Sequence, residues 1–222
     1  MMKLCDVLMS IYPHATIHHG AVVEDGVEIE EGVEIFPYCF IGKGVVIQAG
    51  AKIFPFSTLI GHTVIGARSE VRHSFLEDAV VGSDCFIGPF AHLRPASVIE
   101  NHVKIGNFVE TKNARIGAHS FVSHLSYVGD ASVGAYVNIG AGAITANFNP
   151  YTGEKSQTLI GDHATVGANS VLIAPVTVEA GAAVAASSTI TDTVPAGSLA
   201  IARQKQRNIL NWVEKTKKTQ EI

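Results

Sequence analysis

An aliphatic residue recurs at every sixth position along much of this chain, and this repeat constrains the fold more than any other feature. It runs from Ile17 to Val71, returns from Val81 to Ile105, and returns again from Ile160 to Ile190. A six-residue unit can shield one inward side chain only when the units wind into coils that stack on one another. The repeat therefore predicts an all-β parallel β-helix, with about 4.8 Å between equivalent residues of successive coils.

The repeat also predicts the organisation of the chain. Residues 1–13 form a lead-in, the β-helix covers 14–195, and a tail follows over 196–222. Between Arg207 and Lys218, the apolar residues Ile209, Leu210, Trp212 and Val213 lie among Lys and Arg, which predicts a short amphipathic helix. Because solenoids need protected ends, we expect this tail to cap the last coil; packing on a neighbouring subunit is the alternative.

Composition excludes several classes of protein. The formal net charge is -4 and the chain has no basic run, which argues against a nucleic-acid partner. No apolar stretch approaches the length of a membrane span. The three cysteines, Cys5, Cys39 and Cys85, lack disulfide or metal-ligand spacing. We therefore expect a reduced, cytoplasmic setting.

The repeat slips in four places, which lie mainly in the second half. The slips fall between Val71 and Val81, between Ile105 and Ile116, after Val128, and between Ile139 and Ile160. The last slip contains Pro, Gly and polar residues that cannot continue a strand, so it predicts a loop. Insertions in solenoids often form the binding face, which places the expected site in this half.

Two cations in this half have an informative spacing. Lys112 follows Arg94 by eighteen residues, so an unbroken coil would stack one above the other. Stacked like charges are destabilising unless an anion lies between them, so one interpretation is a phosphate clamp. If the nearby slip falls ahead of Lys112, both residues are ordinary surface cations. The spacing alone favours neither interpretation.

Two histidines allow a metal interpretation. His119 and His124 are five residues apart, a spacing similar to that of zinc ligands in γ-class carbonic anhydrases. A zinc site normally needs at least three protein ligands. Ser83, Asp84 and Cys85 stand near the place where a third histidine would be needed, so a metalloenzyme is the less favoured alternative.

Four motifs together resemble one enzyme family. They are Ile87–Pro95, Gly106–Lys112, His124–Asp130 and Val137–Gly142. In order and spacing they resemble the acetyltransferase domain of the bacterial bifunctional N-acetylglucosamine-1-phosphate uridyltransferase/glucosamine-1-phosphate acetyltransferase. Parallel crossovers are generally right-handed, but this family winds left-handed, and we follow the resemblance. It also implies a homotrimer with sites between subunits.

The resemblance implies a role for each matching position. His124 matches the general base, and Asn147 is a candidate oxyanion donor. The positions that hold the sugar phosphate are Arg94, Lys112, Tyr127, Asn138 and Lys155. The positions that contact acetyl-CoA are Ala141, Asn147, Phe148, Ala168, Ala186 and Arg203. No metal ligand is implied.

The expected activity is transfer of an acetyl group from acetyl-CoA to the 2-amine of glucosamine 1-phosphate. Imidazole changes charge near neutral pH and suits a general base, and we expect Glu110 or Asp130 to orient His124. No cysteine lies near His124 in the motifs, which favours direct transfer. The chain has no Gly-rich nucleotide-binding segment, so we expect no uridyl transfer and a separate uridyltransferase as partner.

Several residues depart from the family pattern. Ser123 replaces a usual Gly, Phe148 and Asn149 replace a Tyr-Asp pair, and Ala168 replaces a usual Ser. These changes leave the base and the clamp in place, but they allow an altered acceptor. They also allow a third class of function, a trimeric scaffold without catalysis.

Overall fold

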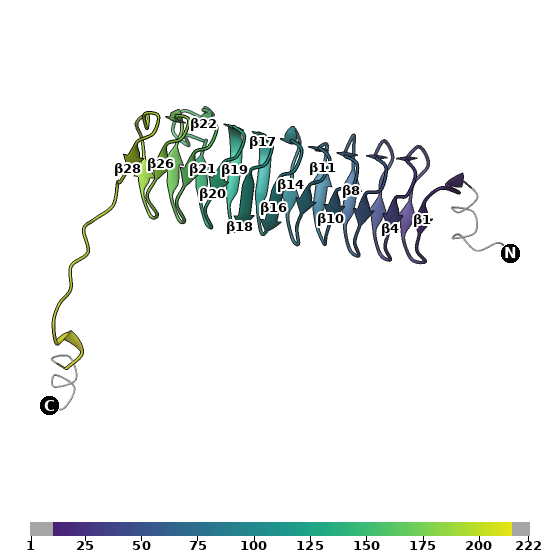
Figure 1. Ribbon diagram of the computed structural model, residues 1–222, viewed down its shortest axis with the longest axis horizontal. Helices are drawn as coiled ribbons and strands as arrows, with labels where there is room; N and C mark the ends of the chain where they lie inside the picture. Colours follow the sequence, from purple (N-terminus) through teal and green to yellow (C-terminus); the bar gives the residue numbers. More distant parts are fainter. Residues whose placement is uncertain (1–10, 215–222) are drawn as a thin grey trace.

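The computed structural model describes residues 11–214, which Figure 1 shows as one elongated solenoid of short parallel strands. Each coil contributes one strand to each of three faces, and about ten coils stack. We number the faces 1 to 3 in chain order. Corner 1 follows face 1, corner 2 follows face 2, and corner 3 leads back to face 1.

Face 1 is an 11-stranded parallel sheet. Its strands are β1 (Thr16–Ile17), β4 (Glu34–Ile35), β7 (Lys52–Ile53), β10 (Glu70–Val71), β13 (Phe86–Ile87), β16 (Lys104–Asn107), β18 (Phe121–His124), β20 (Asn138–Ile139), β23 (Thr165–Val166), β26 (Ala183–Val184) and β28 (Leu199–Ala200). Face 2 comprises β2 (Val22–Val23), β5 (Phe40–Ile41), β8 (Thr58–Ile60), β11 (Phe75–Glu77), β14 (His92–Leu93), β21 (Ile144–Ala146), β24 (Val171–Ile173) and β27 (Thr189–Ile190). Face 3 comprises β3 (Glu28–Ile29), β6 (Val46–Ile47), β9 (Val64–Ile65), β12 (Val80–Val81), β15 (Ser97–Ile99), β22 (Thr158–Ile160) and β25 (Val176–Val178). Two longer strands, β17 (Glu110–Ile116) and β19 (Tyr127–Val133), pass from face 2 to face 3 around corner 2.

The six-residue aliphatic repeat forms the core, as the sequence predicts. Ile35, Ile41 and Ile47 come from three successive strands and have no exposed surface. The same holds for Leu93 and Ile105 in the later coils. Burying one such side chain stabilises a fold by roughly 1.5–3 kcal/mol, so the stabilisation is spread along the whole solenoid.

The N-terminal coils are regular. On face 1, Thr16 pairs with Glu34, Glu34 with Lys52, and Lys52 with Glu70, so each coil takes 18 residues. The first slip removes one residue at corner 1 and another at corner 2. The spacing between paired residues accordingly falls from 18 at Glu70 to 17 at Phe75 and 16 at Val80.

The later slips all lie at corner 2. Asn113 alone turns this corner in one coil and Asp130 alone turns it in the next, while the residues on either side stay in register. In the following coil, residues 147–157 leave the corner between β21 and β22. The irregularities of the repeat therefore gather along one edge of the solenoid.

The C-terminal end differs from the expectation. Strand β28 continues the solenoid past residue 195, because Ala200 pairs with Val184 at an inward position. Residues 212–214 are helical, and the remainder of the predicted helix lies outside the described residues. Figure 1 shows the tail leaving the end of the solenoid, and Trp212 is 58% exposed. Up to residue 214 the tail therefore does not cover the last coil of its own chain.

Candidate active site

Arg94 and Lys112 stack at corner 2. Leu93 pairs with Thr111, so the residues that follow them, Arg94 and Lys112, are aligned in adjacent coils. The slip falls after Lys112, at Asn113. Of the two arrangements that the spacing allowed, the structure has the stacked one.

A third cation, Lys155, joins this pair from the loop of residues 147–157. The charges of Lys155 and then Arg94 lower the pKa of Lys112, because a protonated Lys112 is repelled by both. Arg94 donates a hydrogen bond to Glu110 at 2.8 Å, and the charge of Asp130 acts on Lys112 in the opposite sense, so carboxylates partly offset the three cations. This cluster of Arg94, Lys112 and Lys155, the cation cluster below, has the charge and donors to bind an anion.

Tyr127 lies on face 2 beside the cation cluster. Its hydroxyl lies over Gly129, where a Cβ atom would overlap it. Gly129 is the neighbour of Lys112 in the next coil. The absence of a side chain at Gly129 thus lets the phenol approach the cations.

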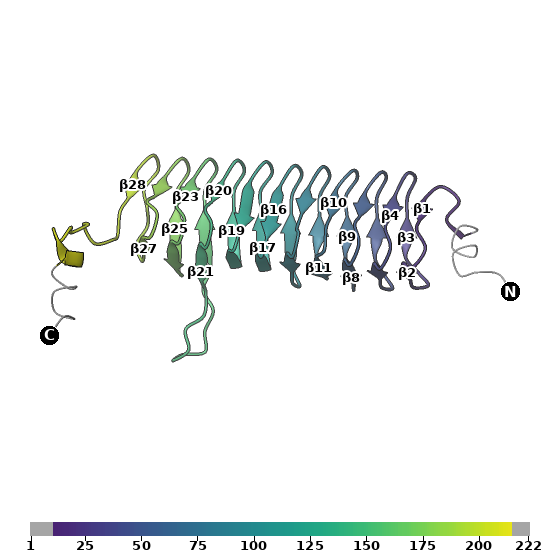
Figure 2. The same ribbon diagram turned by 90° about the horizontal axis from the view of Figure 1, so that it is seen from below.

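The loop that carries Lys155 is an ordered hairpin. Its ends are joined by the backbone hydrogen bond from Ser156 N–H to the Asn147 carbonyl at 2.9 Å, and Phe148 and Lys155 form an antiparallel bridge. Figure 2 shows the hairpin projecting from the body of the solenoid. At its base, Asp130 accepts hydrogen bonds from the side chains of Asn113, at 2.6 Å, and Asn147. A polar pocket of about 330 Å³ lies between Asn113, Asp130 and Lys155.

His124 lies at corner 1, at the opposite edge of face 2 from the cation cluster. Its ring is exposed, and Nδ1 is 2.6 Å from Oδ1 of Asn107. Together with Phe86, Phe90 and Phe108, these two residues line a groove of about 270 Å³. The imidazole is thus open to a substrate.

A row of alanines continues from His124 along corner 1. Backbone hydrogen bonds link His124 to the coil of Ala141, Ala141 to the coil of Ala168, and Ala168 to the coil of Ala186. Arg203 donates a hydrogen bond to the Ala186 carbonyl at 2.9 Å. The structure therefore gathers four of the six residues that the resemblance assigns to acetyl-CoA.

Other predicted site residues do not meet within one chain. Asn138 projects from face 1, while Arg94, Lys112 and Tyr127 belong to face 2. Asn147 and Phe148 lie at corner 2, across face 2 from His124. The Asn147 amide also donates to Asp130, so in this chain it is not a free donor beside the base.

The structure contradicts one sequence-based expectation about His124 and does not support the less favoured metal alternative. Glu110 binds Arg94, and Asp130 binds two asparagines, so neither orients the imidazole. His119 does not approach His124 to form a metal site, because it lies at corner 3. There its ring stacks between His102 at 4.6 Å and Tyr136 at 4.8 Å. Across residues 11–214, no three His, Cys, Asp or Glu side chains gather as possible metal ligands.

Sequence reasoning missed Asn107 and Gly129. Both lie inside the motifs that carry the resemblance, but neither residue type alone suggests chemistry. The signal for Asn107 is its spacing of 17 residues from His124, which equals the length of this shortened coil. The length of this coil follows from the position of the slip at Asn113, which the sequence alone does not give.

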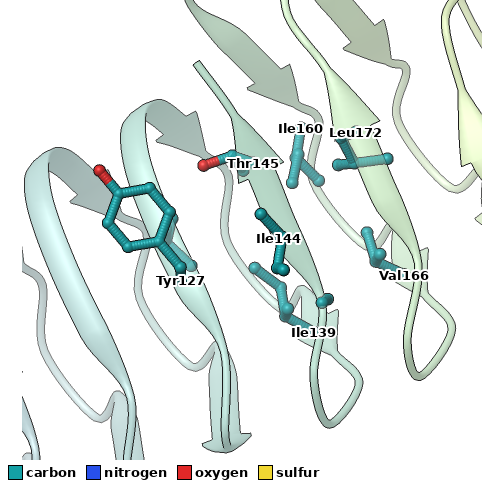
Figure 3. Close-up of a pocket in the computed structure, with 9 residues that line it drawn as sticks. Tyr127, Ile139, Ile144, Thr145, Ile160, Val166 and Leu172 are labelled. Carbon is teal, nitrogen blue, oxygen red and sulfur yellow. The ribbon is translucent and has the colours of Figure 1, made fainter. Parts of the chain in front are cut away.

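The interior beside the site is closed. A cavity of about 10 Å³ lies among Ile139, Ile160, Val166 and Leu172 inside the coils, as Figure 3 shows. This volume is at the lower limit for one water molecule. The site therefore lies on the outer surface of the solenoid. No helix within residues 11–214 is long and apolar enough to cross a membrane.

Solved structures share this fold. The UDP-N-acetylglucosamine acyltransferase from Campylobacter jejuni superposes with a TM-score of 0.55 and 22% identity, covering 91% of this chain and 77% of that one. The enzyme of the same name from Arabidopsis gives a TM-score of 0.55 at 19% identity, covering 91% of this chain and 76% of that one. The left-handed winding expected from the resemblance is confirmed by these left-handed β-helices.

Sequence comparisons give a narrower result. The family model described as bacterial transferase hexapeptide (six repeats) matches residues 78–113, and that described as hexapeptide repeat of succinyl-transferase matches 157–192. The bifunctional protein GlmU of Cellvibrio japonicus is 53% identical over 156 residues, which are 70% of this chain and 34% of that protein. GlmU of Geobacillus sp. is 52% identical over 151 residues, 68% of this chain and 32% of the relative. The chain thus spans about a third of the length of these curated relatives. It belongs to the hexapeptide-repeat acyltransferase superfamily, as a homologue of the GlmU proteins.

Proposed function

We propose that this protein transfers an acetyl group from acetyl-CoA to the 2-amine of glucosamine 1-phosphate. The observation that carries the proposal is the pair of groups at opposite edges of face 2. An exposed imidazole, His124, lies at one edge, and the cation cluster lies at the other. An amino-sugar phosphate has the matching groups, an amine to deprotonate and a phosphate to bind.

The dimensions of the face suit such a substrate. His124 and Gly129 mark the two edges, and five residues of strand span at most about 17 Å. Arg, Lys and Tyr have long side chains, and Tyr127 lies on face 2 between the two edges.

The chemistry is a direct acyl transfer. The amine nitrogen attacks the thioester carbonyl, forming the C–N bond, while Nε2 of His124 accepts the proton that the amine loses. The C–S bond then breaks, and coenzyme A leaves as the thiol after its sulfur takes that proton from the imidazolium. Within residues 11–214, the cysteines Cys39 and Cys85 are buried. Burial raises the pKa of the Cys39 thiol to about 11, so it is no acyl-enzyme nucleophile.

The row of Ala141, Ala168 and Ala186 supports acetyl-CoA as the acyl donor. These small side chains leave room along corner 1 for an extended ligand that ends beside His124. Arg203 at the far end supplies a guanidinium for the phosphates of such a ligand. We place the activity in the cytoplasm, and its product is a substrate for uridyl transfer.

A homotrimer accounts for the residues that one chain leaves apart. Asn138 on face 1, and Asn147 and Phe148 at corner 2, are too widely separated to serve a single site of one chain. Placing corner 2 of one subunit beside corner 1 of the next would bring Asn147 and Phe148 to the His124 of a neighbour. The tail after Ala200, which leaves its own solenoid exposed, would then pack on that neighbour.

The decisive experiment measures thiol release from acetyl-CoA with glucosamine 1-phosphate as acceptor. Glucosamine and other amino-sugar phosphates serve as matched acceptors. We expect turnover that requires both the amine and the phosphate. Equal turnover with glucosamine would contradict the role of the cation cluster, and binding without turnover would support a non-catalytic scaffold.

The shared site is tested by mixing two inactive variants. His124→Ala and Asn147→Ala are unfolded together and refolded as mixed oligomers. Partial return of activity is expected, because some sites then receive an intact residue from each subunit. Activity no higher than that of either variant alone would place both residues in the same chain's site.

A further inference from the structure

His124 has one side-chain partner among residues 11–214, and the backbone fixes its position. Nδ1 of His124 lies 2.6 Å from Oδ1 of Asn107, and the two residues pair in register between β18 and β16. The Leu125 N–H donates to the Asn107 carbonyl at 2.9 Å. A Cβ atom at Gly106 would overlap the Ser123 carbonyl, so a glycine is needed for the coils to approach this closely.

This pairing occurs in only one pair of adjacent coils within the described part of the chain. At the same level of corner 1, the coil before Asn107 has Pro89, and the coils after His124 have Ala141 and Ala168. None of these can hydrogen bond an imidazole through its side chain. The amide and the imidazole therefore form a local pair and are not part of a repeated ladder.

The identity of the atom facing Nδ1 decides which nitrogen can act as a base. An amide oxygen only accepts, so Nδ1 must carry the hydrogen and Nε2 keeps its lone pair. If the amide were reversed, its NH₂ group would donate to Nδ1, and Nε2 would carry the hydrogen. Only the first arrangement leaves Nε2 free to accept a proton from a substrate amine.

We propose that Asn107 is a positioning residue that holds His124 in the Nδ1–H tautomer and so presents Nε2 to the acceptor amine. The expected effect of Asn107 on kcat rests on the proposed acetyl transfer. The tautomer itself is a property of the free protein. An uncharged partner also leaves the imidazolium without the added stabilisation that a carboxylate would give.

The charged groups around this pair are few. Lys104 lines the same groove from β16, and Glu110 and Tyr127 lie on face 2. Glu110 is paired with Arg94. No carboxylate in the described residues hydrogen bonds to His124, so an introduced one has a distinct effect.

The first measurement is nitrogen NMR of the histidine-labelled free protein, with His124→Ala used to assign the signal. We expect the Nδ1–H tautomer in the wild type. In Asn107→Leu, we expect a mixture of tautomers. A wild-type ring with its hydrogen on Nε2 would overturn the inference. Because no substrate is present, this result stands even if the protein proves inactive in acetyl transfer.

The second measurement is the pH dependence of kcat and kcat/KM. Asn107→Ala should lower kcat on the order of 10²-fold with little change in KM, since a misplaced base mainly affects the chemical step. Asn107→Asp should move the acid limb of the profile to higher pH by about one unit or more. Wild-type kcat and profile in both variants would overturn a positioning role.

The matched control is Asn101→Ala. The Asn101 side chain also accepts one hydrogen bond from an adjacent coil, at 2.8 Å from the Ser83 nitrogen, but it lies at corner 3. Asn101→Ala should lower the melting temperature as Asn107→Ala does, and it should leave the pH profile unchanged. Equal loss of kcat in both variants would assign the effect of Asn107 to folding and contradict the inference.

Discussion

The coils before Val71 and those after it share one core but differ at corner 2. In the early coils this corner has a constant length, and successive coils repeat every 18 residues. In the later coils it shrinks to Asn113 or Asp130 and then expands to the hairpin of residues 147–157. The cation cluster lies at this variable corner.

The difference shows that the burial of the inward core residues does not depend on the length of the corner. Thr111 and Val128 stay buried beside the shortened corners, with 0% and 1% exposure. A corner can therefore gain or lose residues without moving the inward row. Stability and chemistry are consequently assigned to different residues, and five predictions test this division.

The largest expected effect is that of His124→Ala. Removing a general base lowers kcat by roughly 10²- to 10⁴-fold, and the melting temperature should hardly change, because the ring is exposed. Thiol release and thermal denaturation measure the two quantities. His119→Ala is the matched control, and comparable loss of kcat there would break the assignment.

A core substitution in the early coils should do the opposite. Ile53→Ala removes a fully buried side chain and should lower the free energy of unfolding by about 2–5 kcal/mol. The kcat of the folded protein should stay at the wild-type value. A marked loss of kcat below the melting transition would show that the early coils take part in the chemistry.

Loss of a clamp cation should act on substrate binding. Lys112→Ala should raise KM by about 10- to 100-fold, as expected for one charge-assisted hydrogen bond. Arg68→Ala is a control from the early coils. Arg68 forms an ion pair with Asp84, at a distance of 2.6 Å, and this pair lies away from the site. The comparison fails if both variants change KM alike.

The lowered pKa of Lys112 predicts that phosphate affinity depends on pH. Lys155 and Arg94 lower the pKa of Lys112, so in the free protein it loses its proton below the ordinary lysine range. A bound phosphate favours the protonated form, so affinity is full below this lowered pKa and falls as pH rises through it. Calorimetric titration with inorganic phosphate from neutral pH to about pH 10 measures the effect. Lys112→Arg should remove this part of the pH dependence, because Arg stays charged.

The smallest effect concerns Gly129. A methyl group there would displace the Tyr127 hydroxyl, which is the end of a side chain that can move. Gly129→Ala should raise KM about fivefold, the value of one hydrogen bond, with little loss of stability. Tyr127→Phe is the comparison. A further rise in KM when Gly129→Ala is added to Tyr127→Phe would indicate backbone strain instead.

The fold could be predicted from the sequence because one inward aliphatic residue per strand is a local rule. Ile35, Ile41 and Ile47 follow it and are fully buried. The position of each slip could not be predicted, because losing a residue on either side of Lys112 leaves the same sequence spacing. Only the pairing of Ser97 with Ala114 places that slip at Asn113.

The site could be predicted as a set of residues but not as an arrangement. The expectation that Glu110 or Asp130 orients His124 came from their charge and proximity in the sequence. In the structure, His124 lies at corner 1, and both carboxylates have other partners, Arg94 for Glu110 and two asparagines for Asp130. The partner of His124 comes from the previous coil, at a distance in sequence that depends on the corner length.

The tolerance of corner 2 has a consequence for how substrate preference can change. One residue turns this corner at Asn113, and eleven residues, 147–157, turn it two coils later, while the strands on both sides stay paired. A loop of new length or composition can therefore be grafted there without redesigning the core. Both evolution and protein engineering can therefore change acceptor contacts at this edge, one coil at a time.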